Sequence, residues 1–138
     1  MDRINTANGL AASAGLGCVW HALVAFAPGQ IALEHCALWL PAALTAGLAA
    51  GAFTLWTRRA GSLLRELLAT LATLYVGVFS YLLVGLTIAS FGAAGLGPIF
   101  PLVEVAWLSC AAVLATGIVT FPLALASRQA VLEAACAR

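Results

Sequence analysis

The uncharged stretch Leu67–Val103, LLATLATLYVGVFSYLLVGLTIASFGAAGLGPIFPLV, decides the fold class. A helix that rises 1.5 Å per residue needs about 20 apolar residues to cross a hydrocarbon core of about 30 Å. This stretch is too long for one such helix and too short for two. We therefore predict a membrane-spanning helix over residues 64–90, followed by a loop over 91–101 that is rich in glycine and proline.

Charged residues divide the rest of the chain into three further uncharged stretches, at 4–33, 35–57 and 105–127. By the same length criterion, each of them holds one span, at about 9–27, 36–56 and 102–126. Pro122 is expected to bend the last turn of the fourth span. The residues after Ser127 either extend that helix or lie on the inner membrane interface.

The composition agrees with a membrane protein, because 64% of the residues are hydrophobic and only 8% are charged. A soluble domain has about a quarter of its residues charged. We predict an all-α polytopic membrane protein, with one antiparallel bundle of four transmembrane helices over residues 1–138 and no soluble domain. The net charge of +1 gives no reason to expect a nucleic-acid partner.

The arginines predict the orientation of this bundle. The chain has no lysine, and in a four-span arrangement all six arginines fall on one side of the membrane. Positive residues mark the cytoplasmic side, so we predict a multi-pass inner (cell) membrane protein with both termini in the cytoplasm. The arginines are Arg3 before the first span, Arg58, Arg59 and Arg65 between the second and third, and Arg128 and Arg138 after the fourth.

Tryptophans are the expected membrane-interface anchors of the second span. Trp39 and Trp56 are 17 residues apart, about 25 Å along a helix, which is close to the separation of the two interfaces. Arg58 and Arg59 would anchor the cytoplasmic end. The other two tryptophans lie deeper, and we expect them to pack between helices; they are Trp20 and Trp107.

The connection between the second and third spans is short, which predicts a helical hairpin. Gly61 suits a left-handed helix cap, and Ser62 can accept from the first free amides of the third helix. Glu66 in the first turn of that helix complements its dipole.

Small residues recur at helical spacing in three of the spans, and they are candidate helix-packing positions because they let backbones approach closely. They can form an interface to partner subunits or to a second copy, or they can pack within the bundle. We expect the Gly47–Gly51 face to lie outside the bundle, toward partners. The positions are Gly9, Ser13 and Gly17; Gly47 and Gly51; and Gly77 and Gly85.

Polar residues gather in the outer half of this arrangement, at His21, Glu34, His35, Tyr81 and Glu104. An intramembrane histidine is a functional candidate, so His21 is the one weak cofactor-ligand candidate; its alternative is a hydrogen bond within the bundle. Glu104 lies close enough to the interface to reach water. No cofactor is predicted. No metal site is predicted either, because the spacing of Cys18, Cys36, Cys110 and Cys136 matches no zinc or haem pattern.

These features leave three functional hypotheses. The first is a non-catalytic accessory or assembly subunit of a larger membrane complex, respiratory or photosynthetic, that packs through the small-residue faces. The alternative is a small homo-oligomeric transporter or channel, with a polar outer-half path at His21 and Glu104. A membrane enzyme or redox protein is the least favoured, because no catalytic motif occurs.

Overall fold

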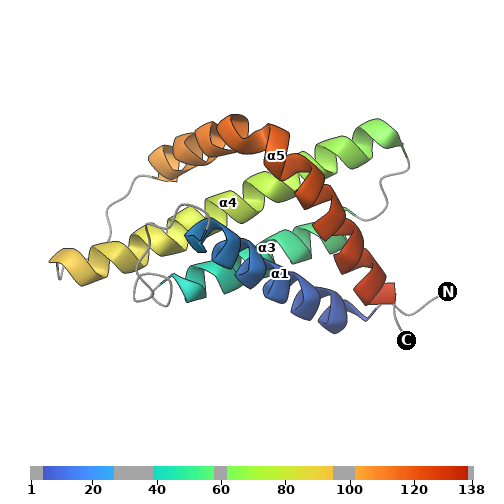
Figure 1. Ribbon diagram of the computed structural model, residues 1–138, viewed down its shortest axis with the longest axis horizontal. Helices are drawn as coiled ribbons and strands as arrows, with labels where there is room; N and C mark the ends of the chain where they lie inside the picture. The colour runs from blue at the N-terminus through green and yellow to red at the C-terminus, as the bar shows by residue number, and fades with distance from the viewer. Residues whose placement is uncertain (1–4, 27–38, 58–61, 95–101, 137–138) are drawn as a thin grey trace.

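The chain forms four α-helices in the part that the computed structural model describes, and its regular structure there is all helical. The described residues are 5–26, 39–57, 62–94 and 102–136. The helices are α1 (Thr6–Phe26), α3 (Leu40–Trp56), α4 (Leu63–Ala94) and α5 (Leu102–Cys136), arranged as in Figure 1. The predicted all-α class is confirmed.

Local sequence signals account for the first turns of these helices. Asn5 precedes α1, and its side-chain oxygen accepts from the backbone N–H of Asn8 at 3.2 Å. Pro41 lies in the first turn of α3, where its missing N–H has no intrahelical partner to lose. Ser62 precedes α4 and accepts from the backbone N–H of Arg65 at 3.4 Å, as predicted. The predicted cap at Gly61 lies outside the described residues.

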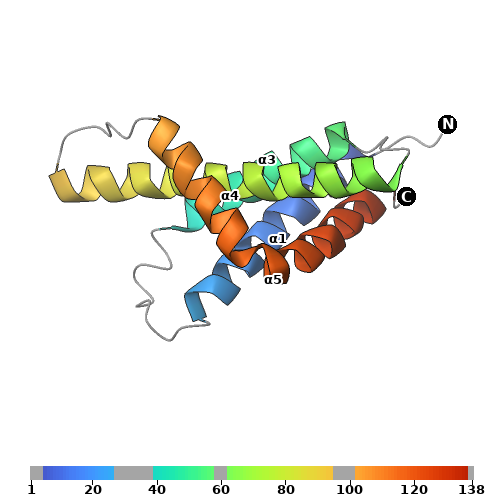
Figure 2. The same cartoon turned by 90° about the horizontal axis from the view of Figure 1, so that it is seen from above.

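Two helices extend further than the sequence predicted. The third predicted span ends at residue 90, whereas α4 continues to Ala94, through the first part of the predicted loop. α5 continues to Cys136, so the residues after Ser127 extend the helix. Pro122 therefore lies inside α5 rather than in its last turn. Figure 2 shows α5 bent in the middle of its length; a proline inside a helix removes one backbone hydrogen bond and kinks it.

The helix ends gather at two ends of the molecule. α1 begins, α3 ends, α4 begins and α5 ends at one of them, which we call the termini end (Figure 1). The Asn5 N–H donates to the carbonyl of Ala135 at 2.9 Å and so ties the first helix to the last. The other ends of the four helices form the loop end. This arrangement alternates the direction of successive helices along the chain.

α1 and α3 pack at very short range through their small residues. A Cβ added at Gly17 would lie 2.5 Å from the carbonyl oxygen of Ala43, and one added at Gly47 would lie 2.5 Å from that of Ser13. The Ser13 hydroxyl donates to the Gly47 carbonyl at 2.6 Å. A Cβ at Gly51 would lie 2.5 Å from the Ser13 Cβ. Such close approach is how helices associate where the surroundings are apolar.

The expectation that the Gly47–Gly51 face lies outside the bundle is therefore wrong, because α1 of the same chain covers it. The remaining small residues also contact neighbouring helices. A Cβ at Gly9 would meet the Cβ of Ala135 on α5 at 3.0 Å. One at Gly77 would make an ordinary contact with Ala50, and Gly85 lies against the ring of Trp39.

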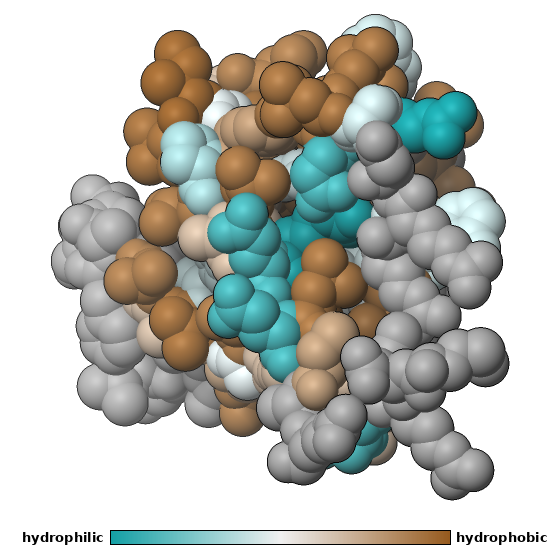
Figure 3. All heavy atoms as spheres, turned by 90° about the vertical axis from the view of Figure 1, so that its right-hand side faces the viewer, coloured by the Kyte–Doolittle hydropathy of each residue, from teal (hydrophilic) through white to brown (hydrophobic). Residues whose placement is uncertain are grey.

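Two described helices, α4 and α5, are long and apolar enough to cross a membrane, and α3 is apolar but shorter. Most of their exposed side chains are apolar, and Ile118 in α5 is 94% exposed. Exposed polar residues occur in the first turns of α1, α4 and α5 and the last turns of α5, and Thr45 and Thr116 are exposed along α3 and α5. Figure 3 views the termini end and shows hydrophilic side chains gathered there among hydrophobic ones.

Candidate functional site: an interhelical cavity with a buried arginine

A cavity of about 310 Å³ lies between the four described helices. Its surface is mostly apolar, with alanine, leucine, valine and glycine as the commonest lining residues, and each helix also contributes polar residues to its wall. This volume lies at the lower end of the range for small-molecule sites, about 300–1,000 Å³, and mostly apolar walls with a few polar groups are typical of such sites. The polar residues include Ser13 and His21 from α1, Thr54 from α3, Tyr81 from α4, and Ser127 and Arg128 from α5.

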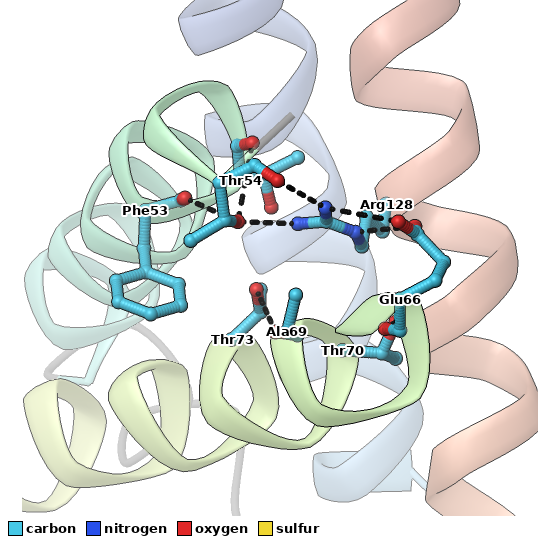
Figure 4. Close-up of polar contacts among 8 residues, drawn as sticks. Phe53, Thr54, Glu66, Ala69, Thr70, Thr73 and Arg128 are labelled. Atoms are coloured by element: carbon cyan, nitrogen blue, oxygen red, sulfur yellow. Dashed lines mark hydrogen bonds and ion pairs between the residues drawn. The ribbon is translucent and has the colours of Figure 1, made fainter. Parts of the chain in front are cut away.

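Arg128 is the most unusual residue of this wall, because it is charged and yet the whole residue is only 1% exposed. Its Nε donates to Glu66 Oε1 at 2.8 Å, and its Nη1 donates to the hydroxyl of Thr57 at 2.8 Å (Figure 4). Its Nη2 donates to the Thr57 carbonyl at 3.2 Å. A buried guanidinium needs both an opposite charge and hydrogen-bond acceptors, and these two residues supply them.

The Arg128 cluster (Thr57, Glu66 and Arg128) joins three helices at the termini end. Thr57 follows the last residue of α3, Glu66 lies in the first turn of α4, and Arg128 lies in the second half of α5. The Thr57 hydroxyl accepts from Arg128 and donates to the Phe53 carbonyl at 2.8 Å, so its proton and one of its two lone pairs are used. The cluster fixes how these helix ends sit relative to one another.

Sequence reasoning missed this cluster. It treated Arg128 as a cytoplasmic surface charge and Glu66 as a partner of the helix dipole. A signal was present, because Arg128 shares helical spacing with Ala124, Val131 and Ala135, which are all buried. An arginine in the middle of a stripe of small and apolar residues faces inward with that stripe, and it then needs a carboxylate within reach.

His21 and Tyr81 meet on the loop-end side of the cavity. The His21 Nδ1 and the Tyr81 hydroxyl are 2.8 Å apart, and their ring centroids are 5.7 Å apart. His21 is 6% exposed, and the ring of Trp39 also packs against Tyr81 at a centroid distance of 5.3 Å. The structure thus brings together two members of the predicted polar group.

The other members of that group are not brought to the cavity by the described residues. Glu104 is exposed in the first turn of α5 and does not line the cavity. Glu34, His35 and Cys36 lie outside the described residues.

The tryptophans divide into packed and outward-facing ones. Trp20 donates from its indole nitrogen to the Ser127 hydroxyl at 3.3 Å, as expected for a residue between helices. Trp107 is 73% exposed, so the expectation that it packs between helices is wrong. Of the predicted anchors, Trp56 is exposed and Trp39 packs against Tyr81 and Gly85, while Arg58 and Arg59 lie outside the described residues.

Within residues 5–26, 39–57, 62–94 and 102–136, no group of three or more His, Cys, Asp or Glu side chains is placed to hold a metal ion. The cysteines Cys18, Cys110 and Cys136 are free thiols. No protein-family model matches the chain, and comparisons with curated proteins and with solved structures found no match either.

Proposed function

We propose that this chain is a four-span membrane protein, with both termini in the cytoplasm, that carries a small molecule through its interhelical cavity. The observation that carries this proposal is the cavity itself, which has Arg128 on its termini-end side and His21 with Tyr81 on its loop-end side. Polar groups at the two sides of an apolar cavity can bind the polar parts of a small molecule and fix its orientation while it passes through. The path lies within a single chain.

Helix length supports four crossings. α1 has 21 residues and α3 has 17, which correspond to about 31 Å and about 25 Å and are close to the hydrocarbon thickness. α4 and α5 exceed it, and a long helix accommodates the bilayer by tilting, kinking or extending beyond it. The alternating directions of the helices support an arrangement with both termini on one side, and the arginines of the sequence support that side being the cytoplasm.

The accessory-subunit hypothesis has less support, because the small residues on which it depended contact helices of the same chain. Purification in mild detergent separates the two functions. Foreign membrane subunits that co-purify in fixed ratio would favour the accessory role. A chain that purifies alone, or only with copies of itself, would favour the transporter.

Reporter fusions test the proposed topology. Reporters placed after Arg59 and at the C-terminus are expected to give cytoplasmic signals, and those placed at Gln30 and after Ala94 external signals, because the arginines hold their side of the membrane in the cytoplasm. The measurement compares alkaline phosphatase with fluorescent-protein fusions at each position. A cytoplasmic signal at Gln30 would overturn the orientation.

Cysteine labelling tests whether water reaches the cavity. In a cysteine-free background, Ser127→Cys and Leu82→Cys are expected to react at least about tenfold faster with a small charged thiol reagent than Ile118→Cys does, because only a hydrated thiol forms the reactive thiolate. Ser127 and Leu82 line the cavity, whereas Ile118 is 94% exposed on the apolar outer face. Equal, slow labelling at all three positions would mean that the cavity is dry and would contradict the transport path.

A further inference from the structure

Arg128 belongs to the cavity wall, but its side chain is 0% exposed while it is bonded to Glu66 and Thr57. Among the described lining residues Arg128 is the one lysine or arginine, and none is a carboxylate. Glu66 pairs with Arg128 but is not part of the cavity wall. Glu66 neutralises this charge in the intact pair, so the guanidinium attracts an anion from the cavity only when the pair opens.

Arg128 also retains hydrogen-bonding capacity. A guanidinium has five N–H groups. The bonds to Glu66 and Thr57 use the Nε hydrogen, both Nη2 hydrogens and one of the two Nη1 hydrogens. The second Nη1 hydrogen has no acceptor among the described residues. The Nη2–Glu66 contact is long, at 3.5 Å, so the pair with Glu66 is held mainly by the Nε bond.

The two sides of the ion pair differ in exposure. The Arg128 side chain is 0% exposed, whereas the Glu66 side chain is 30% exposed. Glu66 can therefore turn into water when another carboxylate takes its place, and its charge is then solvated. Arg128 never loses a neutralising partner in such an exchange, so the large cost of an unpaired buried charge does not arise.

We propose that Arg128 binds the carboxylate of a small apolar organic acid, which replaces Glu66 while its hydrocarbon part occupies the cavity. This inference rests on the proposed function and names its substrate class. Between Thr73 and Tyr81 of α4 the lining residues are apolar, over about 12 Å along that helix. A chain or ring of this length fits there, and its far end would lie beside His21 and Tyr81.

Octanoate, octanol and octylamine form a matched set of probes, because they share a hydrocarbon chain and differ in charge. The full chain is reconstituted in nanodiscs of zwitterionic lipid, and binding is followed by calorimetry and by the rise in thermal unfolding temperature. Octanoate is expected to bind saturably and at least about tenfold more tightly than octanol, with no saturable binding of octylamine. Equal affinity for octanoate and octanol would overturn the proposal.

Glu66→Gln is the decisive variant. It keeps an oxygen acceptor beside Arg128 but removes the competing charge, so octanoate should bind more tightly. If the Arg128–Glu66 pair is formed about nine-tenths of the time, only about a tenth of the molecules can bind octanoate at Arg128. Removing the competing charge then raises the apparent affinity for octanoate by about tenfold. Unchanged or weaker octanoate binding by Glu66→Gln would contradict exchange at Arg128.

The charge-balanced double variant Arg128→Gln with Glu66→Gln keeps polar side chains at both positions without leaving a lone charge. It should lose the preference for octanoate over octanol, and circular dichroism verifies that it is folded. A preference that persists would place the anion elsewhere and overturn the proposal. If the cavity cysteines react but the protein binds octanoate no more tightly than octanol, the transport path is retained and only the anion site is rejected. If the protein prefers octanoate to octanol but the cavity cysteines do not react, the transport path is rejected and the anion site is retained.

Discussion

Gly47→Leu is expected to unfold the isolated chain, rather than only to release a partner. A Cβ at Gly47 would lie 2.5 Å from the Ser13 carbonyl oxygen and 3.0 Å from the Ala14 Cα, and both are backbone atoms of α1. Backbone cannot move aside without separating the two helices. Overpacking costs about 1–3 kcal/mol for extra methylenes in a core, and a leucine against backbone exceeds that range. Denaturant titration in mild detergent, followed by circular dichroism, measures the loss.

The matched control is Gly117→Leu, because a Cβ at Gly117 meets nothing within 4 Å. It should change the unfolding free energy by no more than about 0.5 kcal/mol, as surface substitutions usually do. A Gly47→Leu chain that stays as stable as this control would mean that α1 and α3 are not in close contact.

Gly51 offers a second check, because its obstacle is the Ser13 side chain. A Cβ at Gly51 would lie 2.5 Å from the Ser13 Cβ and 2.7 Å from its Oγ. Ser13→Gly removes both atoms, so it should restore much of the stability that Gly51→Ala loses. It should not rescue Gly47→Leu, whose obstacle is backbone.

The helices could be predicted from the sequence because charge is excluded from long apolar segments. Each of the four predicted spans corresponds to one described helix, and their ends agree with the structure to within about four residues, except that α5 extends to Cys136. Ser62 also acts as predicted, because a hydroxyl just before a helix can accept from a free backbone N–H of its first turn. These features depend on neighbours along the chain and need no knowledge of tertiary contacts.

The inward faces of the helices could not be predicted in the same way. In a chain whose outer surface is as apolar as its interior, hydrophobic periodicity does not separate the two. Trp107 was therefore expected inside and is outside, whereas Gly47 was expected outside and is inside. The Arg128 cluster was missed for a related reason. Arg128 and Glu66 are 62 residues apart, and only the packing of α5 against α4 brings them together.

The two members of the Arg128–Glu66 ion pair are expected to differ in how much stability the chain loses when each is replaced. Glu66→Leu should destabilise the chain by about 3–5 kcal/mol, because it leaves the fully buried Arg128 charge without a counter-ion. Arg128→Met should cost less, because the Glu66 carboxylate is 30% exposed and can turn into water. Each free energy of unfolding is measured by denaturant titration in detergent. Glu133→Gln, at an exposed position near the end of α5, is the control for loss of a carboxylate.

The double variant Arg128→Met with Glu66→Leu completes the cycle. It removes both charges and fills the space with apolar side chains, a replacement that is often neutral for buried ion pairs. It should therefore be more stable than Glu66→Leu alone. Its loss of unfolding free energy should be smaller than the sum of the two single losses by at least about 1 kcal/mol, as is found for residues in contact. Additive costs would mean that the two side chains do not interact. Arg128 would then be buried for another reason, and exchange of Glu66 for a substrate carboxylate would lose its physical basis.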